Sequence, residues 1–363
     1  MTTGIKGIPG DHQPAPIPGS MKAMVLDRTA ELASEPQPLR LATCPTPTPG
    51  PGEILIQVLT CGVCHTELDE IEGRTPPARF PAILGHQIVG RVVARGGAVT
   101  GVELGARVGV AWIHASCGHC RYCREGLENL CPEFRATGRD VPGGYAEYMT
   151  VPAEFAYPLP AAFTEAEAAP LLCAGAIGYR SLRLAHVRDG ESLGLMGFGA
   201  SAHLVLKLAR HSHPDTPVYV FARKPEERAF ALALGARWAG GIEDVCPAPL
   251  TAIIDTTPVW STVVCALGAL APGGRLVINA IRKEESDKSA LLSLDYPRDL
   301  WMEKEIQSVA NVTRADVREF LELAAAIPLR PEVEEYPLEE ANRALHELKH
   351  HRIRGAKVLR VGY

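Results

Sequence analysis

The stretch Leu193-Gly-Leu-Met-Gly197-Phe-Gly199-Ala-Ser-Ala202 decides the fold of the second half of the chain. It continues an apolar run at Ser192–Met196 that is typical of a β-strand, and it leads directly into a helical pattern at Ala202–His211. Farther along, we expect strands at Pro217–Ala222, Ala252–Asp255 and Gly274–Ala280, and helices at Glu226–Gly235 and Val259–Leu270. This alternation predicts a doubly wound parallel sheet with helices on both faces.

The small residues of this stretch match the Gly-x-Gly-x-x-Gly/Ala motif of dinucleotide-binding units, in the strand-to-helix context that the motif requires. Gly197 permits a tight turn, and Gly199 lets a pyrophosphate approach the backbone N–H groups at the helix start. Ala202 keeps the helix close to the strand. An ordinary glycine turn is the alternative, but the surrounding alternation favours a Rossmann nucleotide site.

The end of the next strand indicates which nucleotide is bound. An NAD-binding protein usually carries Asp or Glu there, to accept hydrogen bonds from the ribose hydroxyls. Here Ala222, Arg223 and Lys224 occupy that end, and Asp215 precedes the strand and belongs to the opposite end of the sheet. A small residue followed by two cations suits a 2′-phosphate, so we favour NADP(H) over NAD(H). The alternative is that the two cations are merely solvated.

The first half of the chain and its tail have a different pattern. From Met21 to about Leu171, short β-branched runs punctuated by Gly and Pro predict a mainly β domain. The clearest strands are expected at Ile54–Leu59, Gly90–Ala94 and Arg107–Ala111, and the tail carries two amphipathic helices, Arg314–Ala326 and Leu338–His350, then a strand near Lys357–Val361. Residues 1–20 hold four Pro and four Gly and predict a flexible leader.

Length and charge narrow the class of protein. A chain of 363 residues is long enough for two domains. The net charge of −5 and the pI near 6.2 offer no overall basic field for nucleic acid or anionic lipid. No apolar run approaches the roughly 20 residues that span a bilayer, and the N-terminus shows no secretory signal. We therefore expect a cytoplasmic protein without nucleic-acid or membrane partners.

Four cysteines stand within a short segment, Cys117-Gly-His-Cys120-Arg-Tyr-Cys123 followed by Cys131. Two-residue gaps let neighbouring sulfurs converge on one ion, and four thiolates fill the tetrahedral shell of zinc. A filled shell leaves no open position, so we predict a structural zinc site. An iron–sulfur cluster is the main alternative, because cluster motifs share this spacing. A zinc-ribbon nucleic-acid module fits the acidic balance less well.

Three further candidate ligands are far apart in the sequence. They are Cys64 in Thr60-Cys-Gly-Val-Cys-His-Thr66, His86 in Leu84-Gly-His-Gln87 and Cys173 in Pro170-Leu-Leu-Cys-Ala-Gly175. Open three-ligand zinc sites are usually assembled from distant segments. Taken singly, each residue also has an ordinary explanation: a buried Cys packs as a small hydrophobe, and a lone His satisfies a local hydrogen bond.

Together, and in this order, the run Gly62-Val-Cys-His-Thr66, the Leu-Gly-His at 84–86, the four-cysteine segment and Leu-Leu-Cys-Ala-Gly at 171–175 carry a resemblance. The chain resembles the zinc-dependent alcohol dehydrogenases of the medium-chain dehydrogenase/reductase family from about Met21 to Val361. The resemblance implies an α/β protein with a GroES-like β-rich catalytic domain, residues 21–175 and 308–363. A Rossmann coenzyme domain, residues 176–307, is inserted into it, with the active site in the cleft between the two domains.

The resemblance also implies roles for individual residues. Cys64, His86 and Cys173 correspond to the ligands of a catalytic zinc, and the four-cysteine segment corresponds to the structural zinc site. Thr66 stands in the place of the hydroxyl that relays the alcohol proton. His65 matches a position that contacts the cofactor phosphates, and Trp112 matches a wall of the substrate pocket, although core packing explains Trp112 nearly as well. The implied reaction is reversible hydride transfer between primary alcohols or aldehydes and NADP(H).

The sequence departs from the family pattern at positions near this site. Asp69 stands where many relatives carry the His that ends the proton relay, so either Asp69 or solvent takes the proton. Gln87 replaces the Glu that usually follows the ligand His, which removes a negative charge beside the zinc. Ile177 replaces a Thr that packs against the nicotinamide. The absence of bulk around Thr75 hints at a roomier pocket for medium-chain or aromatic substrates.

Two alternative functions stay open at this point. The first is a zinc-dependent polyol or amino-alcohol dehydrogenase, and the second is a non-catalytic nucleotide-binding sensor, which the substitutions at Asp69 and Gln87 motivate. We also expect a homo-oligomer, a dimer or tetramer, because family members usually pair their Rossmann sheets edge to edge. Residues near Gly274–Ala280 and beyond are the expected edge.

Overall fold

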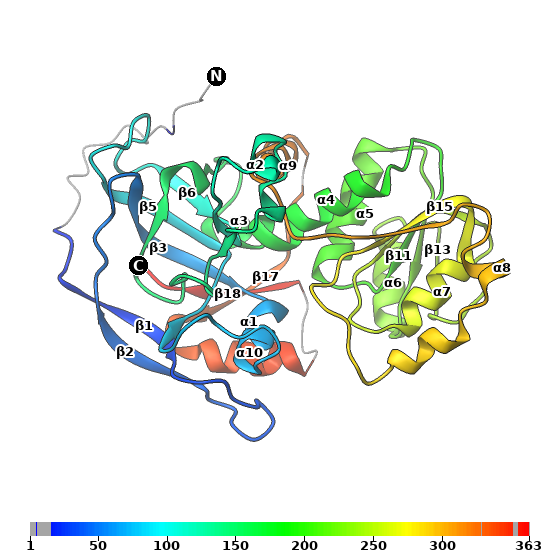
Figure 1. The fold of residues 1–363 in the computed structure, drawn as a ribbon, viewed down its shortest axis with the longest axis horizontal. Helices are drawn as coiled ribbons and strands as arrows, with labels where there is room; N and C mark the ends of the chain where they lie inside the picture. Colours follow the sequence, from blue (N-terminus) through cyan, green and yellow to red (C-terminus); the bar gives the residue numbers. More distant parts are fainter. Residues whose placement is uncertain (1–4, 6–15, 328, 351–354, 363) are drawn as a thin grey trace. The chain divides into compact units, whose positions relative to one another are not determined.

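The computed structural model describes residue 5 and residues 16–327, 329–350 and 355–362. It divides into two compact units, Met1–Cys173 with Thr313–Tyr363 and Ala174–Val312 (Figure 1). The predicted leader, residues 1–20, lies mostly outside the described residues. Within it, Ile5 is buried and forms a parallel bridge with Val102, and Ser20 begins the first strand.

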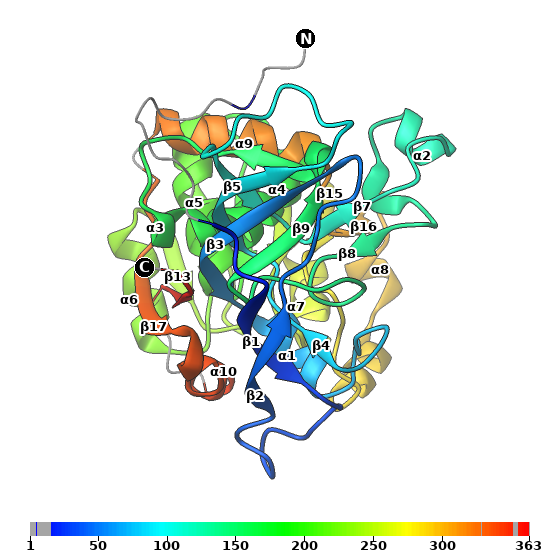
Figure 2. The same ribbon diagram turned by 90° about the vertical axis from the view of Figure 1, so that its left-hand side faces the viewer.

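The first unit is built around an antiparallel sheet in the order β10-β6-β5-β3-β18-β17, with β9 paired to β3 and only the β17–β18 pair parallel. Its strands are β3 (Glu53–Val63), β5 (Ile88–Arg95), β6 (Arg107–Val110), β9 (Tyr148–Pro152), β10 (Ala156–Pro158), β17 (Val333–Pro337) and β18 (Ala356–Arg360). In Figure 2, β3, β5 and β9 run side by side. Strand β3 is central, and its residues Ile54, Ile56 and Val58 are fully buried in the core.

Smaller elements complete the first unit. They are the sheet of β2 (Leu39–Pro45), β1 (Ser20–Leu26) and β4 (Ala82–Ile83), the pair β7 (Ile113–Ala115) and β8 (Arg135–Ala136), and the helices α1 (His65–Ile71), α2 (Arg121–Arg124), α3 (Glu165–Pro170), α9 (Arg314–Ala326) and α10 (Ala341–Lys349). Helix α10 packs against α1 (Figure 1). The C-terminal segment therefore completes both the sheet and its helical cover.

The second unit is a six-stranded sheet in the order β13-β12-β11-β14-β15-β16, with every pair parallel. Its elements are α4 (Ala176–Ala185), β11 (Leu193–Met196), α5 (Ala200–Ser212), β12 (Val218–Phe221), α6 (Pro225–Ala233), β13 (Trp238–Gly240), β14 (Leu250–Asp255), α7 (Ser261–Ala269), β15 (Leu270–Ile278), α8 (Tyr296–Asp299) and β16 (Glu305–Ser308). The chain moves outward from β11 to β13 and, in the opposite direction, from β14 to β16. Because such crossovers are right-handed, the helices of the two halves cover opposite faces.

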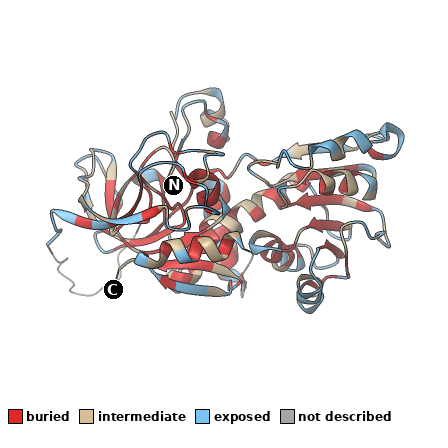
Figure 3. Cartoon of the chain, turned by 90° about the horizontal axis from the view of Figure 1, so that it is seen from below, coloured by how far each residue is buried: buried red, intermediate tan, exposed pale blue. Residues whose placement is uncertain are grey.

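The predicted α/β fold class is thus confirmed, with a GroES-like β-rich unit and a Rossmann-type parallel sheet. Figure 3 shows that the strands of both main sheets are largely buried and that the outer faces of the helices are exposed. Helix α4 and the short strands β13 and β16 were not predicted from the sequence. In the described part of the chain, no helix combines the length and apolarity needed to cross a bilayer.

The edge of the second sheet was expected near Gly274–Ala280 and beyond. The strand at Gly274–Ala280 is β15, which lies between β14 and β16, and the outer strand is β16, farther along the chain. Strand β16 has only four residues, which are largely exposed, and it lacks the apolar run that predicts a strand. Pairing with β15 makes this segment a strand.

Candidate active site

The structure brings Cys64, His86 and Cys173 together from three separate segments of the first unit. Their ligand atoms all lie within 4.8 Å of one another. The Nε2 atom of His86 is 3.7 Å from the Cys64 sulfur and 3.3 Å from the Cys173 sulfur. Ligand atoms around a tetrahedral zinc are separated by about 3.6 Å, given bonds of about 2.3 Å to sulfur and 2.1 Å to nitrogen. The donor set and its spacing fit one zinc ion.

Local structure places Cys64 at the first turn of α1, directly after β3. Its sulfur accepts a hydrogen bond from Thr66 N at 3.3 Å, so Cys64 caps the helix. His86 follows β4 and is preceded by Gly85, whose φ is +96°. A Cβ atom at Gly85 would lie 2.5 Å from the Tyr145 ring and 2.8 Å from the Cys61 sulfur, so this turn into His86 requires glycine.

Cys173 lies in a wide π-helical turn, Leu171–Gly175, which follows α3. Pro170 ends α3, and because proline has no amide hydrogen it cannot donate the next hydrogen bond of the α-helix. The helix widens at this point, as it often does at functional sites. The result is a half-buried thiol beside His86.

Glu67 contacts both Cys64 and His86, and it was not among the residues predicted for the site. One carboxylate oxygen accepts a hydrogen bond from Cys64 N at 2.8 Å, and the other lies 2.6 Å from His86 Nδ1. Glu67 is fully buried. Metal-ligating histidines usually direct their second nitrogen to a carboxylate, which fixes the tautomer. The available signal was the position of Glu67, three residues after a helix-capping residue.

The electrostatics of this cluster favour a bound cation. The hydrogen bond from Cys173 and burial raise the pKa of Cys64 well above its usual range. Although burial alone would lower it, Glu67 and Cys64 raise the pKa of His86 well above its usual range. Both shifts mean that this buried, electronegative site favours added positive charge, which a proton supplies on Cys64 and on His86. A divalent cation bound among them would supply that positive charge instead.

Two further buried polar groups lie near the ligands and were also missed. Neither carboxyl oxygen of Glu70 has a hydrogen-bond partner among the described residues, and neither does the Tyr145 hydroxyl. Burial, then the charge of Glu67, raises the pKa of Glu70 well above its usual range. The same two causes raise the pKa of Tyr145. Buried unpaired polar groups of this kind are commonly satisfied by internal water.

The residues expected to act on the substrate occupy different surroundings. Thr66 is half-buried on α1, and its hydroxyl forms no hydrogen bond within the described chain. His65 is exposed beside it. Asp69 is buried and paired with Arg74, whose Nε lies 2.5 Å from its carboxylate. The same guanidinium also pairs with Glu72, so Arg74 is shared between two carboxylates.

Trp112 and Gln87 are both buried in the first unit. The Trp112 ring lies 5.0 Å from the Phe134 ring and 5.2 Å from the Arg139 guanidinium, and its buried Nε1 has no hydrogen-bond partner among the described residues. Gln87 is buried against Gly62, where a Cβ atom would lie 2.7 Å from the side-chain oxygen. The neutral amide thus occupies a tightly packed position next to His86.

The four cysteines of the 117–131 segment, here called the cysteine lobe, also converge. Their sulfurs lie within 4.8 Å of one another, with 3.9 Å between Cys117 and Cys123 and 3.6 Å between Cys120 and Cys123. Backbone N–H donation from His119 lowers the pKa of the Cys117 thiol to about 6. Thiolates spaced about 3.8 Å apart fit a tetrahedral zinc with four protein ligands.

A buried ion pair attaches the lobe to the tail of the chain. Arg314, the first residue of α9, donates from its backbone N and its Nε to Glu128 at 2.8 and 3.0 Å. Glu128 is buried within the lobe. The Glu128 side chain therefore links the lobe to the C-terminal segment through Arg314.

The predicted nucleotide loop lies in the second unit. Gly197 has a φ of +80°, and Gly199 is the N-cap of α5 without a side-chain cap. A Cβ atom at Gly199 would meet nothing within 4 Å, so the open space beside this helix start is available to a ligand. Ala222 is buried at the end of β12. Ala202 is buried on α5, and Arg223 and Lys224 are exposed, with no ion pair within the described chain.

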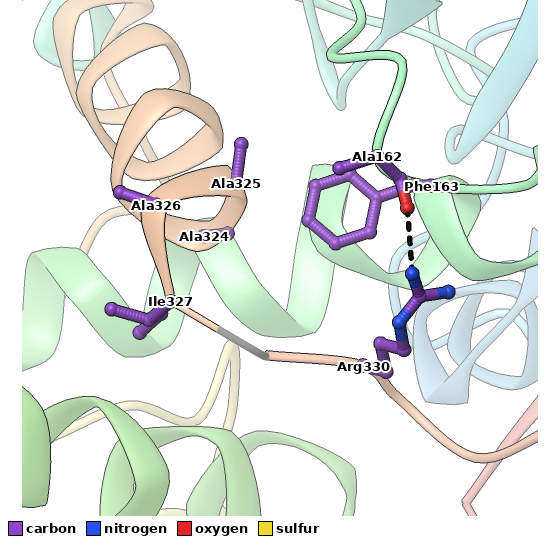
Figure 4. Close-up of a pocket in the computed structure, with 7 residues that line it drawn as sticks. All are labelled: Ala162, Phe163, Ala324, Ala325, Ala326, Ile327 and Arg330. Atoms are coloured by element: carbon purple, nitrogen blue, oxygen red, sulfur yellow. Dashed lines mark hydrogen bonds between the residues drawn. The ribbon is translucent and has the colours of Figure 1, made fainter.

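A cavity of about 270 Å³ lies elsewhere in the first unit, lined by Ala162, Phe163, Ala324, Ala325, Ala326, Ile327 and Arg330 (Figure 4). Arg330 donates to the carbonyl of Ala162 at 3.1 Å and to Glu167 at 2.8 Å, so its charge is already paired. The residues that line the cavity include none of the predicted zinc ligands or substrate-contacting residues. We therefore do not assign this cavity to the reaction.

Comparison with known proteins agrees with this geometry. Residues 50–161 match the family model described as the alcohol dehydrogenase GroES-like domain. The chain is 45% identical to the probable alcohol dehydrogenase AdhA of Mycobacterium tuberculosis over 94% of each chain. It is 32% identical to an alcohol dehydrogenase of Geobacillus stearothermophilus over 85% of this chain and 92% of that one.

A solved structure is similar in fold as well as in sequence. The cobalt- and zinc-bound thermostable alcohol dehydrogenase of Pyrobaculum aerophilum superposes with a TM-score of 0.83 at 27% identity, covering 94% of this chain and 100% of that one. The chain is an oxidoreductase that acts on a small molecule with zinc and a nicotinamide cofactor. It belongs to the zinc-dependent alcohol dehydrogenases of the medium-chain dehydrogenase/reductase family.

Proposed function

We propose that this enzyme interconverts primary alcohols and aldehydes with NADP(H), using one catalytic and one structural zinc per chain. The observation that carries the proposal is the convergence of Cys64, His86 and Cys173 at tetrahedral spacing, with Glu67 against the far side of the His86 ring. Three protein ligands leave one position open for a substrate oxygen, whereas the four sulfurs of the cysteine lobe leave none.

Each side chain of this site is assigned a separate role in the reaction. A zinc with an open position supplies Lewis-acid polarisation of the alcohol or carbonyl oxygen. Glu67 keeps the proton of His86 on Nδ1, so that Nε2 is free to bind metal. The Thr66 hydroxyl has no hydrogen-bond partner among the described residues, and we assign it to take the alcohol proton or return it. Trp112 is assigned to a wall of the substrate pocket.

We further propose that water, rather than Asp69, exchanges the relayed proton. The Asp69 carboxylate is already held in an ion pair, with Arg74 Nε 2.5 Å from its Oδ1. The variant Asp69→Asn tests this point. Turnover within about twofold of wild type supports solvent exchange, and a loss of two or more orders of magnitude would instead place Asp69 in the relay.

Selection of NADP(H) is attributed to the end of β12. The buried Ala222 presents no carboxylate to a 2′-phosphate, and Arg223 and Lys224 are exposed and unpaired in the described chain. Arg223 is assigned to bind the phosphate through its planar guanidinium, with Lys224 adding charge. His65 is assigned to the cofactor pyrophosphate, as the family resemblance implies.

The experiment measures oxidation of NADPH and of NADH side by side, with benzaldehyde and with a short- and a medium-chain aldehyde. The paired variants are Arg223→Ser and Ala222→Asp, in protein of known zinc content. A preference for NADPH that falls in Arg223→Ser and reverses in Ala222→Asp supports the proposal. A wild-type preference for NADH would overturn the cofactor assignment while leaving the zinc chemistry in place.

A panel of polyols and amino alcohols, run in the oxidising direction, tests the alternative substrate class. Higher kcat/KM on that panel than on primary alcohols would replace the proposed substrate. Because the relatives are alcohol dehydrogenases, we expect turnover rather than a nucleotide-sensing role.

We also propose that two copies pair along β16. This strand is bonded to β15 on one side only, and Ile306 in it is 48% exposed. Unpaired strand edges with apolar side chains favour pairing with another copy. A dimer by light scattering that becomes a monomer in Ile306→Lys supports this interface. A monomeric wild type, or a dimer unaffected by the variant, would exclude it.

A further inference from the structure

A second cluster of buried polar groups lies in the nucleotide unit, at the carboxyl ends of β14 and β15. The strand order reverses between β11 and β14. In open parallel sheets, ligands bind outside the carboxyl ends of the strands at such a reversal. The side chains that shape this edge are therefore candidates for positioning the nucleotide.

Lys283, in the segment after β15, is inserted into this edge. Its Nζ donates to Asp255 Oδ2 at 2.5 Å and to the carbonyl oxygens of Thr257 and Val259 at 2.9 and 3.0 Å. The side chains of Lys283 and Asp255 are 6% and 0% exposed. All three ammonium hydrogens are thus accounted for inside the protein.

Asp255, which binds Lys283, also binds the segment that follows β14. Its Oδ1 accepts from the Thr257 backbone N and hydroxyl at 2.9 and 2.8 Å, and its Oδ2 accepts from Thr262 at 3.0 Å. A carboxylate that accepts three hydrogen bonds from threonine groups and a fourth from a buried ammonium has a fixed position. The backbone at Thr257 is therefore fixed with it.

The same loop holds this segment at two more points. Glu284 N donates to the Pro258 carbonyl at 2.7 Å. Asp287 Oδ2 accepts from the backbone N of Trp260 and of Ser261 at 2.8 and 2.9 Å, at the start of α7. We refer to Lys283, Glu284 and Asp287 as the 283–287 clasp. The clasp connects the segments that follow two neighbouring strands.

The clasped segment packs directly against the turn of the nucleotide motif. A Cβ atom at Gly197 would lie 2.9 Å from Thr257 Cγ2 and 3.1 Å from Thr256 Oγ1. Thr256 also donates its backbone N and its hydroxyl to the Met196 carbonyl, both at 3.0 Å. Thr256 and Thr257 thus form the wall behind Gly197, and Gly197 begins the turn that leads to the open helix start at Gly199.

We propose that Lys283 is a positioning residue for the dinucleotide, acting through Asp255 and Thr257 on the turn at Gly197. The proposal rests on nicotinamide-cofactor binding at this loop and not on the choice between NADP(H) and NAD(H). A purely structural role is the alternative. Buried ion pairs often add little to stability compared with apolar residues of similar size, so stability alone gives a weak reason for this pair.

The test measures the Kd of NADPH and of NADH by fluorescence quenching in the zinc-loaded full chain, together with Tm and zinc content. The variants are Lys283→Met, the conservative Lys283→Arg, and Lys288→Met as a matched control on the same loop. Lys288 forms an exposed ion pair with Glu285 at 3.0 Å, outside the clasp. We expect Lys283→Met to weaken both nucleotides by about tenfold or more. Zinc content and kcat at saturating nucleotide stay near wild type, Lys283→Arg recovers part of the affinity, and Lys288→Met is unchanged.

Two results would overturn the proposal. One is a folded Lys283→Met protein with wild-type Kd for both nucleotides, and the other is a loss no larger than in Lys288→Met. If Lys283→Met does not fold, the neutral pair Lys283→Gln with Asp255→Asn decides: wild-type Kd in that double variant rejects the positioning role, and weakened Kd supports it. A wild-type enzyme that binds neither nucleotide would instead refute the cofactor assignment of the family, a separate failure.

Discussion

The cysteine lobe and the Cys64–His86–Cys173 site offer similar donor atoms but are assembled in opposite ways. The lobe draws its four sulfurs from one short segment, oriented by backbone N–H groups of its own turns. The other site gathers its ligands from the end of β3, the turn after β4 and the π-turn after α3, with Glu67 buried behind them. A local cluster depends on turn geometry alone, whereas a distributed one depends on the fold of the whole unit.

The largest expected effect separates the two sites by activity. In Cys64→Ser, turnover falls by about three orders of magnitude or more, because losing a zinc ligand removes several kcal/mol of charge stabilisation. Of the two zinc ions proposed per chain, we expect one to be lost, as measured by metal analysis alongside turnover. The control Cys44→Ser, at a cysteine outside both sites, retains both ions. Equal loss of both ions in Cys64→Ser would mean that the sites are not independent.

The next effect concerns stability. Cys120→Ser empties the lobe and lowers Tm, because the binding free energy of a structural zinc is part of the folding free energy. At a temperature where the variant remains folded, its turnover per catalytic zinc is retained, since the ligands of the other site are untouched. Turnover and Tm are measured on the same preparation. A variant with wild-type Tm would show that the lobe does not need metal.

A smaller effect sharpens the role of Glu67. In Glu67→Gln, the affinity of the distributed site for zinc falls by about 10–100-fold, the range typical when a carboxylate behind a histidine ligand is removed. Competition with a chelator measures this loss, and the lobe keeps its zinc. Glu133→Gln, at an exposed carboxylate near the lobe, serves as the control. Unchanged zinc affinity in Glu67→Gln would leave Glu67 with only a helix-capping role.

The smallest effect concerns pH and the hairpin beside the lobe. Burial, aided by Arg135, lowers the pKa of His114 to about 4. In the unfolded chain, histidine titrates near pH 6.5, so between about pH 6.5 and 4 only the unfolded state takes up this proton. The free energy of unfolding therefore falls as the pH falls through that window.

Between pH 7 and pH 5, protonation of His114 in the unfolded chain lowers the free energy of unfolding by about 2 kcal/mol. This contribution is absent in His114→Gln. Denaturant unfolding at the two pH values measures it. His211→Gln, at an exposed histidine, leaves the wild-type pH dependence in place. Identical acid sensitivity in wild type and His114→Gln would mean that His114 accepts a proton in the folded state.

The features that could be predicted from the sequence are those whose residues lie close together in it. The glycine motif, the strand-helix alternation and the cysteine lobe are local patterns, and the structure contains each of them. For Cys64, His86 and Cys173, the residues alone left a shared metal as one possibility, and the family resemblance assigned it, because their separation in sequence has no fixed geometric meaning.

Contacts between side chains from distant segments could not be predicted, because they correspond to no local sequence pattern. The contact of Glu67 with His86, the pairing of Asp69 with Arg74 and the insertion of Lys283 against Asp255 each join groups whose proximity follows from the fold. The edge strand β16 is a strand because β15 offers it partners, not because its own residues favour extended structure.

The pairing of β3 with β18 has a consequence for the order in which the protein is made. The residues just before Cys64 lie opposite the last strand of the chain, with Val63 across from Lys357 and Cys61 across from Leu359. During synthesis, we expect the cysteine lobe to assemble once its own segment has left the ribosome. The distributed site follows β3, which pairs with β18 in the folded unit, so we expect its final geometry only after Ala356–Arg360 has also emerged.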